Sequence, residues 1–361
     1  MRFIDLLHRW AGGLVGLALA VLGLSGALLV HKDAWLRATL PSAADAQERS
    51  ISGISAALDT IYAGSEAPRA VVLASDTLGV HILRFKDDAG AYADQNGAIV
   101  ARWRTPADRV ETWVFDLHHH LLAGETGEII AGALGLAGLV FVITGCVLWW
   151  RTRRTFRLRL WPARASIPAI RRHHRDLGIV AAPLLVMVML TGAMLIFKPV
   201  AAFVLSPFSS PAEMTAATTP PQQKGGAMPK QIDWRDLLET AHQQFPNAEP
   251  RVIILPRKPG GLLSLRVRQP GEWLPNGRTT LWFDPATGRL VRADDALTAP
   301  LGNRMFNMVF PLHAAKIGGL AYRLVMTAVG LALFTLGSLT VASFWAGRIG
   351  RRAGINRRFA T

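Results

Sequence analysis

The sequence predicts a membrane α-helical protein with four transmembrane helices in two tandem repeats, each repeat carrying a small external α+β domain. Three observations lead to this prediction. Four long blocks contain no charged side chain, arginines gather at one end of these blocks, and a set of short motifs recurs in the same order in both halves of the chain. Half of the 361 residues are apolar, and the uncharged blocks hold the excess.

Each uncharged block is long enough to cross a bilayer, which takes about 20 residues at a rise of about 1.5 Å per residue. A buried helix of a soluble protein rarely runs that far without a charge. The first block is longer than the core of a signal peptide and has no small-residue cleavage site before His31, so we expect it to stay as a helix. The blocks are residues 11–30, 129–150, 177–197 and 324–346.

The distribution of charge predicts the membrane topology. Residues 1–10, 151–176 and 347–361 hold sixteen arginines and only two acids, whereas the remaining polar segments are nearly balanced. The net charge of +15 therefore lies almost wholly beside helix ends, as the positive-inside rule predicts for cytoplasmic loops. The lipid bilayer is the expected counter-charge, and no nucleic-acid partner is expected.

The expected organisation places both termini in the cytoplasm. In chain order it has a cytoplasmic N-terminus with the first transmembrane helix (1–31), a first external α+β domain (32–127), the second helix (128–150), a basic cytoplasmic loop (151–176), the third helix (177–198), a linker with the second external α+β domain (199–320), the fourth helix (321–346) and a basic cytoplasmic tail (347–361).

The two halves of the chain share their motifs. The sequence His-Arg at the start of the first helix (8–9) returns at 174–175, and the Ser-Gly step at 25–26 returns as Thr-Gly, both at an offset of 166. A Phe-x-Leu-His motif precedes the second helix at 115–118 and the fourth helix at 310–313. Each half therefore contains one helix out, one external segment and one helix back.

The external segments predict small α+β domains. Each contains an amphipathic stretch, two strand-like runs and a turn motif, and residues 206–230 between the third helix and the second domain have a linker composition. The amphipathic stretches are 51–64 and 234–245, the strand-like runs are 70–73, 81–85, 251–255 and 263–267, and the turn motifs are 92–97 and 283–288.

Histidines gather near the ends of the uncharged blocks. Eight of the ten lie within about one to two helical turns of a block end. Axial ligation of haem at the edge of a membrane needs imidazoles so placed, although histidine is also tolerated at the headgroup level. The single cysteine, Cys146, lies inside the second block, so any haem must be held without covalent attachment. The eight are His8, His31, His118, His119, His120, His173, His174 and His313.

The repeat suggests how these histidines pair on one haem. His8 and His174 begin corresponding helices and could share one iron. His173 is the neighbour of His174 and points about 100° away around the helix, so only one of the two should face His8. Arg9 and Arg175 directly follow the expected ligands and are candidates to hold haem propionates.

A second haem is expected at the other side of the membrane. His118 and His313 occupy the corresponding Phe-x-Leu-His motifs, and His31 is a third candidate for the two axial positions. His119 and His120 are either not needed for ligation or one of them replaces His118. The expected cofactor is therefore haem b, two per chain, with each iron held by two histidines.

Other classes of function are disfavoured by the residues. The uncharged blocks contain neither acidic, basic nor histidine side chains, which weighs against an ion-coupled transporter. No Gly-rich dinucleotide fingerprint opens a soluble helix, so electrons would come from a quinol or a separate cytoplasmic flavoprotein.

Taken in order, these motifs resemble the PepSY-associated transmembrane family, often called iron-regulated membrane proteins. The resemblance covers nearly the whole chain, and its residues are 8–10, 116–118, 174–176, 284–288 and 312–313. It implies PepSY-like external domains in the periplasm and a multi-pass location in the bacterial inner membrane. It also implies an oxidoreductase acting on metal ions, which binds haem and reduces a ferric siderophore to release iron.

Two alternatives remain open at the level of sequence. One is a non-enzymatic PepSY-type membrane protein that binds or regulates a partner protein. The other is a haem electron-transfer subunit that serves a periplasmic redox protein.

Overall fold

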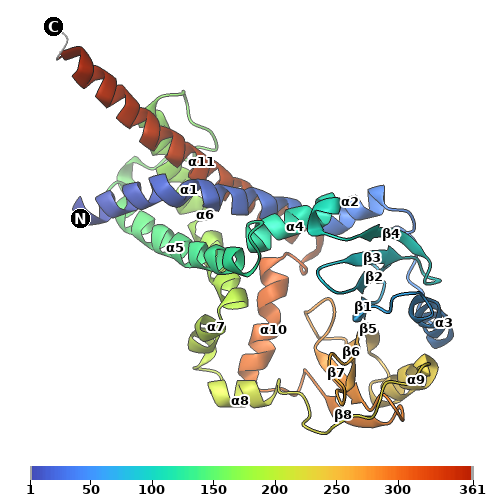
Figure 1. Cartoon of the computed structure of the whole chain (residues 1–361). Coiled ribbons are helices and arrows are strands. Elements are labelled where there is room, and N and C mark those ends of the chain that lie inside the picture. Colours follow the sequence, from blue (N-terminus) through green and yellow to red (C-terminus); the bar gives the residue numbers. More distant parts are fainter. Residues whose placement is uncertain (1, 359–361) are drawn as a thin grey trace. The chain divides into compact units, whose positions relative to one another are not determined.

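The computed structural model describes the backbone of residues 2–358 and the side chains of residues 2–348. The chain divides into two compact units, shown with their elements labelled in Figure 1. Side chains of the expected cytoplasmic tail beyond residue 348 lie outside the described residues. Unit 1 comprises Met1–Val30, Val114–Val200 and Leu312–Thr361, and unit 2 comprises His31–Trp113 and Ala201–Pro311.

Four long helices build unit 1, and each is long and apolar enough to cross a membrane. They form a closed ring of neighbours (Figure 1), because α1 contacts α11 and α5 while α6 contacts α5 and α11. Apolar side chains of all four helices meet in one core cluster. The prediction of a multi-pass membrane protein with four transmembrane helices is confirmed. The helices are α1 (Arg2–Leu29), α5 (Gly124–Trp150), α6 (Ile167–Ile196) and α11 (Gly319–Arg358).

The helices extend beyond the uncharged blocks, and this changes where the histidines lie. Helix α1 begins at Arg2 and α6 begins at Ile167, each well before its block. A membrane helix can extend into polar sequence outside the hydrocarbon, because its backbone groups stay hydrogen-bonded within the helix. Pro168, in the first turn of α6, favours a helix start at that point. His8 and His174 therefore lie within helices and not in the turns before them.

Helices α1 and α11 approach each other through glycines. A Cβ added to Gly23 would lie 2.7 Å from the carbonyl oxygen of Gly330, and a Cβ on Gly330 would lie 2.6 Å from that of Gly23. Side chains at either position would force the two backbones apart. Small residues permit such close packing between membrane helices, where no hydrophobic effect draws them together.

Unit 2 contains one eight-stranded antiparallel sheet in the order β4-β3-β2-β1-β5-β6-β7-β8. Helices α3 (Ile51–Tyr62) and α9 (Trp234–Gln244) contact each other and contribute to one core with the sheet (Figure 1). The strands are β1 (Ala70–Val72), β2 (His81–Arg84), β3 (Gly90–Ala93), β4 (Ile99–Trp103), β5 (Glu249–Ile254), β6 (Leu263–Arg268), β7 (Thr279–Phe283) and β8 (Leu290–Asp294).

This single sheet differs from the two separate external domains expected from the sequence. Strands β1 and β5 pair with Val71 opposite Ile253, so each expected domain contributes four strands to the same sheet. Two separate sheets would leave the backbone N–H and C=O groups of β1 and β5 unpaired at their edges, and pairing the two strands satisfies these groups. The two helices share the core as well, since the rings of Tyr62 and Trp234 stack with their centroids 4.7 Å apart.

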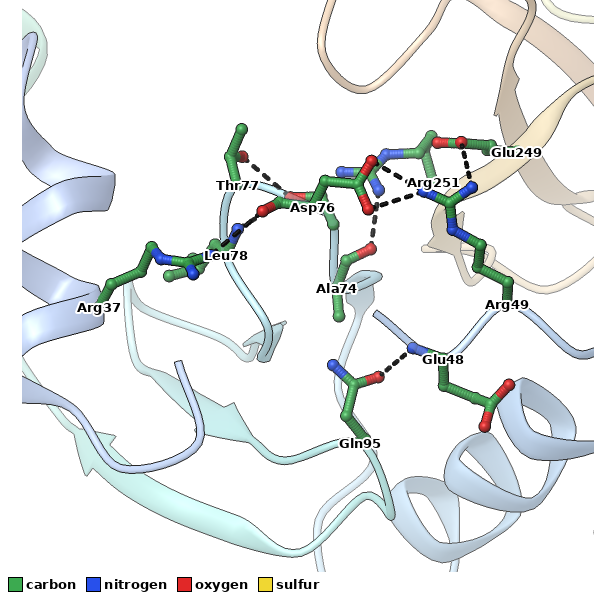
Figure 2. Close-up of polar contacts among 11 residues, drawn as sticks. Arg37, Glu48, Arg49, Ala74, Asp76, Thr77, Leu78, Gln95, Glu249 and Arg251 are labelled. Atoms are coloured by element: carbon green, nitrogen blue, oxygen red, sulfur yellow. Dashed lines mark hydrogen bonds and ion pairs between the residues drawn. The ribbon is translucent and has the colours of Figure 1, made fainter. Parts of the chain in front are cut away.

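Polar side chains reinforce the β1–β5 junction (Figure 2). The Arg49 guanidinium lies 2.8 Å from the Asp76 carboxylate and 4.0 Å from that of Glu249. Arg251, in β5 and only 4% exposed, donates to the carbonyl oxygen of Ala74 at 2.7 Å. These contacts connect the segment after β1 to β5, so both halves of the sheet are fixed to each other through side chains as well as backbone.

The turn motifs lie where the sequence predicts them. Asp94 accepts the backbone N–H of Asn96 and Ala98 at 2.9 Å, and Asp284 accepts that of Ala286 at 3.0 Å. The expected linker contains a capped helix, α8. The remaining helices are α2 (Lys32–Thr39), α4 (Val110–His120), α7 (Lys198–Leu205), α8 (Pro211–Ala216) and α10 (Leu301–His313), with short 3-10 helices at Pro106–Asp108 and Arg153–Thr155.

Candidate functional site: two histidine pairs in the helical unit

The first histidine pair is formed by His8 of α1 and His174 of α6. Their ring centroids lie 6.2 Å apart with the ring planes at 76°. Phe141 of α5 makes an edge contact with His8 at 5.7 Å between centroids. Two imidazoles from helices far apart in the sequence are thus held across one gap inside unit 1.

The second histidine pair is formed by His118 and His313, which lie at the C-terminal ends of α4 and α10. Their ring centroids are 6.3 Å apart with the planes at 43°. Desolvation lowers the pKa of His118 to about 3 and that of His313 to about 4. Both imidazoles are therefore neutral at ordinary pH, which is the form that can bind a metal.

Both spacings match two imidazoles bound to the same iron. Two metal–nitrogen bonds of about 2.0 Å and two ring radii of about 1.1 Å give roughly 6.2 Å between ring centroids. The separation is 6.2 Å in the first pair and 6.3 Å in the second. Imidazoles in direct hydrogen bond or stacking contact would lie closer. The residues of both pairs therefore fit axial ligation of haem.

Each of the four imidazoles has its Nδ1 atom beside a hydroxyl group of a membrane helix. The four distances are nearly equal, which makes the arrangement systematic. They are His8 to Thr144 at 2.9 Å, His174 to Thr340 at 2.9 Å, His118 to Ser25 at 3.0 Å and His313 to Thr191 at 3.0 Å.

These hydroxyls decide which imidazole nitrogen carries the proton. Each hydroxyl donates to a backbone carbonyl one turn earlier in its own helix, at 2.6 to 2.8 Å. Its single hydrogen is then used, so it can only accept from the imidazole, and Nδ1 must carry a hydrogen. Nε2 keeps its lone pair in all four rings. Fixing the tautomer through the second ring nitrogen is the usual support for a metal-binding histidine.

A cavity of about 790 Å³ surrounds the first histidine pair. Its volume lies within the range of about 300–1,000 Å³ that is common for cofactor sites. Apolar side chains and glycines from all four membrane helices line it, and the lining includes Gly12, Gly16, Gly138, Gly178 and Gly337. The volume and the apolar share of the lining suit a large apolar cofactor. Of these glycines, Gly178 leaves open space, because a Cβ there would have its nearest neighbour at 4.0 Å, whereas Gly16 and Gly337 pack against each other.

A family model described as the PepSY-associated TM region matches residues 6–348. The chain belongs to this family. The match contains both histidine pairs and all four hydroxyls, and it confirms the resemblance drawn from the short motifs. A search of the curated proteins finds no match.

Two residues expected at the first histidine pair of this PepSY-associated protein have other partners. His173 is fully buried, and its Nε2 lies 3.0 Å from the carbonyl oxygen of Leu160, so it faces the 151–166 loop and not His8. Arg175 donates to the side chain and backbone of Thr155 and to Asp176. Both side chains attach the 151–166 loop to α6. The guanidinium of Arg175 donates to Thr155 of this loop and to Asp176 of α6.

The other cations around this cavity are differently placed. Arg9 lines it and forms an ion pair with Asp5 at 3.5 Å, with 44% of the arginine side chain exposed. Arg171 also lines the cavity and was not singled out from the sequence. Arg171 lies three residues before His174 on α6, a spacing that places both side chains on the same side of a helix. This spacing is the signal in the sequence that could have identified it. The arginines that line the cavity are Arg2, Arg9, Arg151, Arg171 and Arg175, and all five are candidates for acidic groups of a cofactor.

Three further histidines were expected as candidate outer ligands, and the structure places them as follows. His31 belongs to unit 2, where it is the N-cap residue of α2. His119 faces Glu128, with Nε2 to Oε1 at 4.0 Å, and His120 binds Asp116 at 2.7 Å.

The hydroxyl residues Ser25, Thr144, Thr191 and Thr340 do not stand out as site residues in the sequence. Ser25 and Thr191 already lie in the repeated step before Gly26 and Gly192. Those glycines leave room for the rings, since a Cβ on either would lie 3.0 Å from a histidine Cε1 atom.

Proposed function

We propose that this PepSY-associated protein is a haem-containing reductase of the bacterial inner membrane. It takes electrons from a quinol or a cytoplasmic flavoprotein and reduces ferric siderophore in the periplasm, which releases the iron. The arginine-rich ends and both termini are cytoplasmic in this proposal, and the two halves of the chain are tandem repeats. The supporting observation is the pair of bis-imidazole sites with the same spacing and the same fixed tautomer.

The residues of unit 1 have three tasks in this function. Each histidine pair would hold one haem iron. The hydroxyls orient the imidazoles, and the apolar helix faces exclude water. Bound at these pairs, haem b would supply one-electron transfer between a donor on one side of the membrane and a ferric chelate on the other. No side chain needs to donate or remove a proton for the reduction of iron.

The two pairs lie at different depths along the helices. Ser25, which contacts His118, is 17 residues after His8 in α1, so the pairs are separated by about 26 Å along the helix axis. That is most of the hydrocarbon thickness of about 30 Å. Sites near opposite faces of the bilayer suit electron transfer across it.

The test is a reduced-minus-oxidised visible spectrum with a pyridine haemochrome assay on protein purified in detergent from haem-supplied cells. We expect about two haem b per chain in the wild type and about one in each double variant, His8→Ala/His174→Ala and His118→Ala/His313→Ala. His242→Ala is the control, because this exposed histidine of α9 lies in unit 2.

Addition of a ferric siderophore to the reduced protein should restore the oxidised spectrum. Haem that stays reduced with every chelate, but is reoxidised by a periplasmic redox protein, would favour the electron-transfer subunit. A haem-free protein that remains folded would contradict the reductase and favour the partner-binding alternative.

A further inference from the structure

A second group of histidine and carboxylate side chains lies outside the two histidine pairs. His119 and His120 end α4, and Glu128 lies in the second turn of α5. Their possible ligand atoms all lie within 4.8 Å of one another. Two ligand atoms on one metal, each about 2.0–2.2 Å from it, can be at most about 4.4 Å apart, so small side-chain rotations suffice to bring all three onto one ion.

An unusual turn between α4 and α5 brings these side chains together. Leu121 and Leu122 both have positive φ, at 48° and 60°, a conformation that leucine rarely adopts. Gly127 packs directly against the end of α4, since a Cβ there would overlap the carbonyl oxygen of His120. The chain reverses within four residues as a result, and Glu128 comes to lie beside His119.

The two histidines are prepared for metal binding in the way that metal ligands usually are. Asp116 lies 2.7 Å from Nδ1 of His120, which leaves Nε2 of that ring for a ligand. Phe115 stacks on His119 with the centroids 5.3 Å apart and the planes 12° apart, which fixes that ring. Nε2 of His119 faces Glu128 at 4.0 Å, and about a third of each side chain is exposed, so an ion can enter from solvent.

The repeated motif does not reproduce this group in the second half. When the two Phe-x-Leu-His motifs are aligned, Ala314 and Ala315 take the places of His119 and His120. His119 and His120 are therefore not part of the arrangement that His118 and His313 share.

We propose that His119, His120 and Glu128 form a ferrous-iron site that receives the product of the reduction. Two imidazoles and one carboxylate with open positions are a ligand set typical of non-haem Fe(II). Siderophore oxygens are hard ligands that favour Fe(III), whereas imidazole is softer, so iron moves to this site after reduction and not before. The identity of the metal as iron rests on the proposed function, while the existence of a divalent-metal site does not.

The experiment measures binding of isotopically labelled ⁵⁷Fe²⁺ to the haem-loaded protein, without oxygen and without siderophore. Mass spectrometry of the gel-filtered protein separates added ⁵⁷Fe from haem iron. We expect about one extra iron per chain in the wild type, and affinity at least about tenfold weaker in His119→Ala and in Glu128→Gln. The haem spectrum should be unchanged. Glu125→Gln, an exposed acid one turn earlier in α5, is the control and should bind like the wild type.

The iron-binding experiment distinguishes an error in the proposed metal site from an error in the proposed reductase function. Wild-type protein that retains no ⁵⁷Fe²⁺, or variants that bind as tightly as wild type, would overturn the proposed site whatever the reductase assay shows. Retained ⁵⁷Fe²⁺ that is lost in both variants supports it, even where ferric siderophore does not reoxidise the haem.

Discussion

At the scale of single residues, the hydroxyl beside each paired histidine determines which imidazole nitrogen carries the proton and leaves Nε2 with its lone pair. Thr144 accepts from Nδ1 of His8 and donates to Val140 of its own helix. In Thr144→Val the shape is kept and the acceptor is lost, so His8 can adopt the other tautomer. We expect roughly tenfold weaker retention of one haem, because loss of a supporting contact weakens metal sites by about 10–100-fold. Haem content after dilution against apomyoglobin measures it.

The matched control for that change is Thr335→Val in α11. Thr335 donates to Leu331 of its own helix in the same way, but it is exposed and serves no histidine of either pair. Equal haem retention in the two variants would show that the Thr144 contact does not support a ligand.

A buried histidine in unit 2 makes folding sensitive to pH. His81 is 2% exposed, and its Nδ1 accepts the backbone N–H of Ala74 at 3.1 Å. Burial lowers the pKa of His81 from 6.5 to about 4. The unfolded chain then binds a proton more readily than the folded chain, so stability is complete above about pH 6.5 and falls as the pH drops toward 4. The loss is about 3 kcal/mol at about 1.4 kcal/mol per pKa unit.

Thermal unfolding of the purified protein between pH 7.5 and pH 4.5 tests this. His81→Asn keeps an acceptor for Ala74 but cannot titrate, so the melting temperature of this variant should fall less than that of the wild type over the same range. Parallel curves for the two proteins would show that His81 does not contribute.

The sequence predicted which histidines lie in pairs better than it predicted their surroundings. His8, His174, His118 and His313 stand out because each recurs in a repeated motif. Whether His174 or His173 faces His8 depends on how α6 is rotated about its axis relative to α1. The residues around His173 and His174 do not define that rotation. The hydroxyl partners lie 93 to 166 residues away from their histidines, so only the folded helices bring them together.

At the scale of elements, helices and strands followed from composition, whereas their ends and partners did not. Uncharged blocks predicted all four membrane helices, but α1 begins in polar sequence that carries no hydropathy signal. Runs of apolar, β-branched residues predicted β1 and β5 as strands, but their pairing joins segments about 180 residues apart in the chain. Pairing across that distance depends on which edges are free after local folding.

The α1–α11 contact gives a prediction at the same scale. The methyl group of Gly330→Ala would meet the backbone of Gly23 and the side chain of Ala27 at 2.6 to 2.9 Å. We expect a loss of about 1–3 kcal/mol, which is typical of overpacking, because neither backbone can move without disturbing the ring of four helices. The thermal midpoint of the detergent-solubilised protein measures the loss.

Gly135→Ala is the matched control for that substitution. Its methyl group would lie 3.4 Å or more from α6, an ordinary van der Waals distance. A drop in the thermal midpoint as large as that of Gly330→Ala would indicate that helix glycines are needed generally and not at the α1–α11 contact.

At the scale of the whole molecule, charge and helix number together define a topology. Four spanning helices return the chain to its starting side, and the arginine-rich 151–176 loop lies on that side as well. Unit 2 is built from the segments that follow α1 and α6, so we expect both of its parts on the opposite side. The pairing of β1 with β5 requires this, since strands of one sheet cannot lie on both sides of a bilayer.

Cysteine labelling in intact cells tests that topology. Cys146 is the only cysteine, so Cys146→Ala gives a background into which single exposed cysteines can be placed. Ser65→Cys in unit 2 should react with a membrane-impermeant maleimide in cells whose outer membrane is permeabilised. Arg157→Cys in the basic loop should react only after lysis, because the positive-inside rule places it in the cytoplasm. Labelling of Arg157→Cys before lysis would invert the orientation, and the direction of electron flow in the proposed reductase would then have to be reversed.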